Sequence, residues 1–120
     1  MNVAGESSKF GYAPERLLAE VVQVNALRRL ELQGLMTIAP WTTEPEKARP
    51  VFRRLRELKG QCEALLDAPL PHLSMGMSGD FEVAIEEGAT LIRVGTALFG
   101  ARVSAGRARA VAESEPPWDT

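Results

Sequence analysis

Helical and extended patterns alternate along this sequence, and the alternation limits the fold more than any other feature. Amphipathic helical spacing covers residues 14–27 and 45–66, and strand-like apolar runs cover 30–38, 73–75 and 90–94. Strands separated by helices pair in parallel through right-handed crossovers. The sequence therefore predicts an α/β fold with parallel strands, and its 120 residues suit one domain.

Local signals define where the helices begin. Pro14 suits the first turn of the first helix. Thr43, followed three residues later by Glu46, has the pattern of a capping box for the second helix. Pro50 removes a backbone hydrogen bond inside that span, so we expect a kink or a late helix start there.

Two strand ends carry glycine and hydroxyl residues where a helix should begin. They lie in residues 73–80 (LSMGMSGD) and 93–100 (RVGTALFG). Ser78 is the candidate N-cap of a helix that Gly88 ends. Because helix starts present free backbone N–H groups to anions, two such corners predict a phosphate-binding cradle.

Alternation alone leaves an open doubly wound sheet and a barrel as alternatives. The sequence has no G-x-G-x-x-G turn that would favour a dinucleotide fold. Phosphate-binding loops on the last two strands are typical of (β/α)8 barrels. The two corners therefore favour the barrel.

Composition excludes several classes of partner. The net charge is −2, and the basic residues do not cluster with aromatic ones, so we expect no nucleic-acid partner. No run of eighteen apolar residues or signal peptide is present, so we expect no membrane association and a cytoplasmic protein. One cysteine, Cys62, and one histidine, His72, are too few for a zinc site.

Several motifs carry a resemblance to a known family. Residues 73–80, 84–88 (AIEEG) and 92–100 (IRVGTALFG) resemble the closing signature of the pyridoxal-phosphate homeostasis protein family, and residues 2–11 and 34–38 resemble its middle section. That family is similar to the barrel domain of alanine racemase. The resemblance implies that residues 1–103 form the carboxyl-terminal half of a (β/α)8 TIM barrel, followed by a polar, flexible tail at 104–120. It also implies a non-catalytic protein that binds pyridoxal 5′-phosphate (PLP) in PLP homeostasis.

The resemblance assigns roles to five residues. Ser78 and the backbone near Met77 would hold the cofactor phosphate, together with Gly95 and Thr96 at the start of the last helix. Arg93 would face the pyridine nitrogen of PLP. A permanent cation there disfavours a pyridinium, which weakens the ring as an electron sink. This environment favours a carrier over an enzyme.

The chain also departs from the family pattern. A (β/α)8 barrel needs roughly 250 residues, whereas three clear strands and the stub of a fourth are expected here. The Schiff-base lysine of the family belongs to the other half, so no residue is assigned that role, although Lys9 is expected near the mouth of the cofactor site. We expect a truncated fragment whose exposed barrel edges favour self-association.

Other readings of the same residues stay open. A PLP-dependent racemase or decarboxylase would need a catalytic acid/base, and Tyr12 is the only tyrosine. A degenerate fragment would bind no cofactor. Taken alone, Ser78 reads as a helix cap, Arg93 as half of a salt bridge and Met77 as filler of the core.

Overall fold

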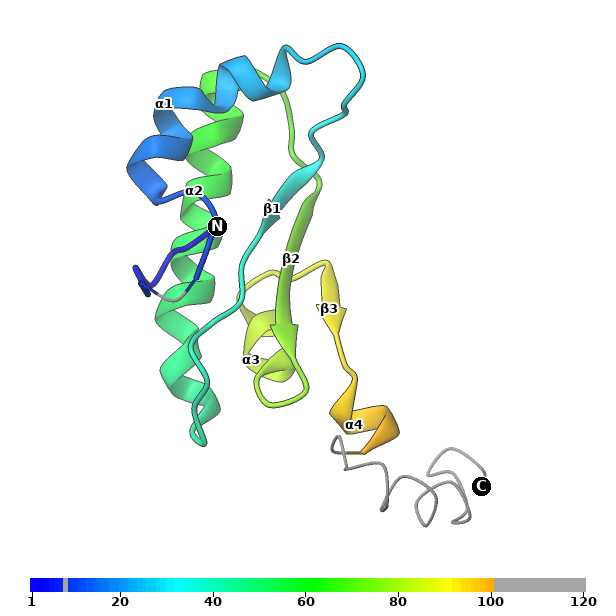
Figure 1. Cartoon of the computed structure of the whole chain (residues 1–120). Coiled ribbons are helices and arrows are strands. Elements are labelled where there is room, and N and C mark those ends of the chain that lie inside the picture. The colour runs from blue at the N-terminus through cyan, green and yellow to red at the C-terminus, as the bar shows by residue number, and fades with distance from the viewer. Residues whose placement is uncertain (8, 101–120) are drawn as a thin grey trace, which may run out of the picture.

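The chain folds into a three-stranded sheet with helices packed against it, which confirms the α/β class with parallel strands (Figure 1). The computed structural model describes residues 1–7 and 9–100, so the tail expected at 104–120 lies outside the described residues. The elements are α1 (Pro14–Asn25), β1 (Gly34–Met36), the 3₁₀ turn η1 (Pro45–Ala48), α2 (Arg49–Leu66), β2 (His72–Met77), α3 (Phe81–Glu86), β3 (Leu91–Arg93) and α4 (Thr96–Phe99).

The sheet has the strand order β1-β2-β3, and both pairs are parallel. Leu35 lies opposite Leu73, and Met36 lies opposite Ser74. Beyond Ser74 the register between β2 and β3 shifts, so that Met77 pairs with Arg93. All three strands run toward the end of the sheet where α4 lies (Figure 1).

The first residues of the chain lie beside β1 and take the place of the expected strand stub. The described part of residues 1–12 contains no strand. The amino group of Met1 donates to the carbonyl of Met36 at 2.7 Å, and Thr37 Oγ1 donates to the carbonyl of Met1 at 2.9 Å. The amino-terminal segment is therefore held against the end of β1.

The core lies between the sheet and its helices. Leu35, Leu73 and Met75 from the strands are buried with α2 and α3, while α1 packs against α2. The buried residues of α2 keep the predicted spacing of three and four, and they are Phe52, Leu55, Leu58 and Cys62. Each large apolar side chain buried in this way contributes about 1.5–3 kcal/mol to stability.

The predicted capping box at Thr43 is wrong. Glu44 precedes η1, and no side chain caps the turn. The hydroxyl of Thr42, one residue earlier than expected, accepts a hydrogen bond from the Glu44 N–H at 3.1 Å. Helix α2 begins only at Arg49, so the late start predicted from Pro50 is confirmed.

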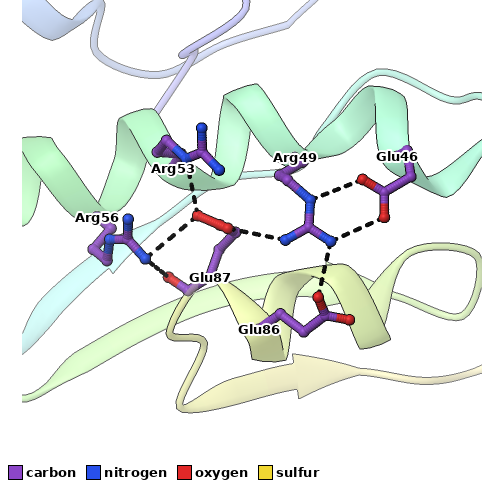
Figure 2. A network of polar contacts seen from close by, with 6 residues as sticks. All are labelled: Glu46, Arg49, Arg53, Arg56, Glu86 and Glu87. Carbon is purple, nitrogen blue, oxygen red and sulfur yellow. Dashed lines mark hydrogen bonds and ion pairs between the residues drawn. The ribbon is translucent and has the colours of Figure 1, made fainter.

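A charged network ties α2 to the end of α3. It contains Glu46, Arg49, Arg53, Arg56, Glu86 and Glu87 (Figure 2). Glu87 is only 5% exposed, and its carboxylate accepts from Arg53 Nε at 3.2 Å and from Arg49 Nη1 at 3.0 Å. These hydrogen bonds hold the pKa of Glu87 below its ordinary value of 4.5, and the bond from Arg53 has the larger effect.

The substitution Glu87→Gln is expected to lower the urea midpoint at neutral pH, because the arginines lose their buried counter-charge. The folded-state pKa of Glu87 is depressed, so its stabilising contribution is present above pH 4.5 and is lost as the pH falls through the folded value. The difference between the variant and the parent should therefore shrink as the pH falls below 4.5. Urea titrations from neutral pH downward measure it.

Glu86→Gln is the matched control, since the Glu86 side chain is exposed and forms one ion pair, to Arg49, within the described part of the chain. It should change the midpoint little at any pH. Equal losses in the two variants would contradict the role given to Glu87.

Candidate functional site

A cleft of about 590 Å³ opens at the carboxyl ends of the three strands. Its walls come from the segments that follow β1, β2 and β3, and the lining residues are Lys9, Ile38, Ala39, Pro40, Trp41, Thr42, Met77, Ser78, Gly79, Asp80, Gly95 and Thr96. Parallel α/β sheets bind ligands at this edge, and small-molecule sites span about 300–1,000 Å³. The cleft therefore has the place and the size of a site for a small molecule.

The structure brings four of the five predicted site residues together. Met77 ends β2 and Ser78 follows it, Gly95 and Thr96 follow β3, and all four line the cleft. Arg93 is not among the lining residues. The two predicted corners therefore meet at one site, while the arginine lies on the sheet beside it.

The turn after β2 differs from the prediction, because Ser78 does not cap α3. Asp80 occupies the N-cap position. Its Oδ1 accepts a hydrogen bond from the Met77 N–H at 2.7 Å, and its own N–H donates to the Met77 carbonyl at 3.1 Å. This reciprocal pair closes the turn, so the Met77 N–H already has a partner, and a carboxylate stands in the cleft wall.

The corner after β3 opens directly into the cleft. Gly95 is the N-cap of α4, and its carbonyl accepts from the N–H groups of Leu98 and Phe99 at 3.1 and 2.8 Å. No atom of the described residues lies within 4 Å of a Cβ placed at Gly95, so these residues leave the space above its backbone open. The hydroxyl residue Thr96 follows at the first position of the helix. The corner predicted after β3 therefore borders the cleft.

Arg93 bridges the three strands. Its Nη1 donates to Ser74 Oγ on β2, and its Nη2 donates to the carbonyl of Thr37 just after β1, both at 3.0 Å. Its Nε is buried and has no acceptor among the described residues. Buried donors without a partner are uncommon in folded proteins.

Eight lining residues were not among the predicted site residues, and Trp41, Asp80 and Lys9 are three of them. Trp41 is 88% exposed and stands at the cleft in the loop after β1. Asp80 closes the turn after β2, and Lys9 reaches the cleft from the amino-terminal segment, where it was expected near the mouth. The signal for Trp41 is its place after the apolar run that ends at Pro40, since all carboxyl ends of a parallel sheet share one edge.

Another hollow, of about 330 Å³, also borders the turn after β2. Its lining includes Glu46, Asp80, Glu82 and Glu86. This concentration of carboxylates disfavours a phosphate there. An anion is therefore better placed in the larger cleft, which has Lys9 in its wall.

Within residues 1–7 and 9–100, no group of three or more His, Cys, Asp and Glu residues has the arrangement of a metal site. The helices in that part of the chain are all too short or too polar to cross a membrane.

Comparisons with known proteins agree on one family. The protein-family model described as alanine racemase, N-terminal domain, matches residues 1–103 of this chain. The pyridoxal phosphate homeostasis protein of Aquifex aeolicus is 52% identical over 102 residues, which are 85% of this chain and 45% of that protein. The protein of the same name from Pseudomonas aeruginosa is 52% identical over 102 residues, which are 85% of this chain and 43% of that protein.

Solved structures of related proteins have a fold similar to that of this chain. PipY of Synechococcus elongatus, with PLP bound, has 40% sequence identity and a TM-score of 0.70, over 75% of this chain and 43% of PipY. The structure of PipY without PLP gives 38% identity and a TM-score of 0.73. The chain spans less than half the length of the relatives it matches. Because the family model covers most of the sequence, this chain belongs to the alanine racemase N-terminal domain family, together with the pyridoxal phosphate homeostasis proteins.

Proposed function

We propose that this chain binds PLP in the cleft at its strand ends and takes part in PLP homeostasis without catalysing a reaction. The observation that carries the proposal is the meeting of two glycine-and-hydroxyl corners in one cleft of suitable size. The PLP bound in the PipY structure and the names of the relatives support the choice of ligand.

The phosphate is proposed to lie between the two corners. Ser78, Gly95 and Thr96 would hold it through hydroxyl and backbone N–H groups, with Met77 as the adjoining wall. The open space above Gly95 admits a close approach. The carboxylate of Asp80 lines the same cleft, so its negative charge would repel the phosphate and weaken binding.

The ring nitrogen of PLP is proposed to lie near Arg93, whose buried Nε lacks an acceptor among the described residues. Bound PLP supplies an electron sink when that nitrogen is protonated. The guanidinium disfavours this protonation, since two adjacent cations repel. Tyr12 is absent from the cleft lining and lies beside Arg16 instead. The proposed position of Arg93 and the observed place of Tyr12 support a carrier over a racemase or decarboxylase.

Residues 1–103 are proposed to represent the carboxyl-terminal half of a (β/α)8 barrel. Met36 and Leu91 share a sheet face with Ser74 by register, and they are 42% and 51% exposed. That face would be the interior of a closed barrel. Its apolar side chains and the edge strand β3 favour self-association of this chain. The anchoring lysine of the family is assigned to no residue here.

The double substitution Ser78→Ala with Thr96→Ala is expected to weaken PLP binding at least about thirtyfold, because two hydrogen bonds to a charged group are lost. Equilibrium dialysis with PLP measures the change. Pyridoxal, which lacks the phosphate, should bind the parent and the variant alike.

Asp80→Asn is the matched control in the same wall. Its amide oxygen can still accept from the Met77 N–H, while the charge that opposes phosphate is removed, so PLP should bind a few times more tightly. Unchanged PLP binding in the Ser78 and Thr96 variant would refute the phosphate site. A parent chain that binds no PLP would refute the proposed function.

A further inference from the structure

The walls of the cleft continue directly into two elements that the charged network joins. One wall, residues 38–42, leads into η1, which begins at Pro45. Another wall, residues 77–80, ends where α3 begins at Phe81. Because both connections are short, the separation of η1 and α3 bears on the width of the cleft.

Carboxylates crowd the gap between η1 and α3. The hollow of about 330 Å³ is lined on one side by η1 and on the other by the turn after β2 and by α3. Its acidic side chains are Glu46, Asp80, Glu82 and Glu86. Like charges at close range repel one another. A cation that contacts both elements would therefore hold them together.

Arg49, the first residue of α2, is that cation. Its Nε and Nη2 donate to the two carboxylate oxygens of Glu46 at 2.8 and 2.9 Å (Figure 2). Nη2 also donates to Glu86 at 2.9 Å, and Nη1 donates to Glu87 at 3.0 Å. A guanidinium bonded through all three nitrogens has a fixed plane. Arg49 therefore fastens η1 to the carboxyl-terminal end of α3.

The other two arginines of the network lack this double contact. Arg53 and Arg56 pair with Glu87 from later turns of α2, and neither pairs with Glu46 among the contacts of the described residues. They join α2 to α3 without holding η1. Arg49 and Arg53 thus form a matched pair, since both neutralise Glu87 but only Arg49 also binds η1.

We infer that Arg49 is a positioning residue for the cleft: by holding η1 against α3, it sets the distance between the wall that carries Trp41 and the corner at Ser78. This inference rests on the proposed function. Arg49 is absent from the cleft lining, so it acts without touching the ligand. Without it the cleft is open part of the time and binds PLP more weakly, because only the closed fraction is competent.

The test compares Arg49→Met with Arg53→Met, each of which removes one charge and keeps an unbranched side chain. Both should lower the urea midpoint, because Glu87 loses a counter-charge in each. Equilibrium dialysis should show PLP binding about tenfold weaker in Arg49→Met, and within about twofold of the parent in Arg53→Met. Stability and affinity are thereby separated.

A second readout needs no PLP. Trp41 quenches a bimane label attached through Gly79→Cys only at short range, and both positions line the cleft. The described residues leave open space where a Cβ at Gly79 would lie, and the native Cys62 is buried away from the label. Quenching should be lost in Arg49→Met and kept in Arg53→Met. Trp41→Phe gives the unquenched baseline.

Glu46→Gln replaces Arg49→Met in both experiments if the methionine variant does not fold, because the pairs of Arg49 with Glu86 and Glu87 remain. The Glu46 side chain is 71% exposed, so the urea midpoint should change little. PLP binding should still weaken about threefold, since η1 is no longer held by a full charge pair.

The outcomes separate the inference from the proposed function. If the parent binds no PLP, the proposed function fails, and the quenching of bimane still decides whether Arg49 holds the wall. If PLP affinity falls equally in Arg49→Met and Arg53→Met, or falls in neither, the inference is overturned. Equal quenching in the parent and in Arg49→Met also overturns it.

Discussion

Gly34→Ala is expected to destabilise the fold by about 3 kcal/mol or more, because overpacking against backbone cannot be relieved by a side-chain rotation. A Cβ at Gly34 would overlap the carbonyl oxygen of His72 and lie 2.7 Å from its carbonyl carbon. Gly34 is the partner of His72 in the parallel pair, and the His72 N–H donates to Gln33 at 2.9 Å. Relief would require β1 to move away from β2.

Gly60→Ala is the matched control and should change stability in the opposite direction. Gly60 lies within α2, is exposed, and would present its Cβ to open space. Alanine in a helix interior is favoured over glycine by about 0.5–1 kcal/mol. Urea unfolding followed by far-UV circular dichroism measures both variants. A Gly34→Ala chain as stable as the parent would contradict the close approach of the two strands.

The sequence predicted the elements of the sheet better than their ends. The apolar run at 30–38 forms a strand only over Gly34–Met36. The pairing of β1 with β2 does not extend to residues before Gly34, because Pro71 has no N–H to donate. The Leu70 N–H donates to the Glu63 carboxylate at 2.9 Å instead of to the segment before β1. Glu63 is on α2, so this competition arises only once the helix is packed against the sheet.

The location of the site could be predicted because it depends on chain order alone. Strand ends in a parallel sheet share one edge, so residues after β2 and β3 had to meet. The finer assignments needed three-dimensional contacts. Ser78 and Asp80 are both good caps by residue type, and only the observed turn shows that Asp80 takes the position. The partners of Arg93, Ser74 and Thr37, lie 19 and 56 residues away in the sequence.

Of the substitutions considered, Arg93→Leu is expected to change the protonation of the bound PLP ring most. The substitution removes the cation proposed to face the ring nitrogen of PLP, so the pKa of that nitrogen should rise by about 1 to 3. A ¹⁵N titration of labelled PLP bound to the chain measures the change. The carrier character proposed above depends on this charge, since a protonated ring is the better electron sink.

The same variant should also lose stability, because the Thr37 carbonyl and Ser74 Oγ lose their charged donor. The expected cost is about 1–3 kcal/mol. Arg93→Lys separates the two effects: it keeps the positive charge, but one ammonium replaces the rigid fork that spans both acceptors. It should therefore keep the ring nitrogen unprotonated at reduced stability.

Arg54→Leu is the control for losing an arginine elsewhere, since Arg54 lies on α2 and pairs with Glu57 at 3.8 Å. It should leave the titration of the bound ring unchanged. If Arg93→Leu also left that titration unchanged, the guanidinium would serve only to join the strands. Weak ring protonation in this chain would then need another cause than Arg93.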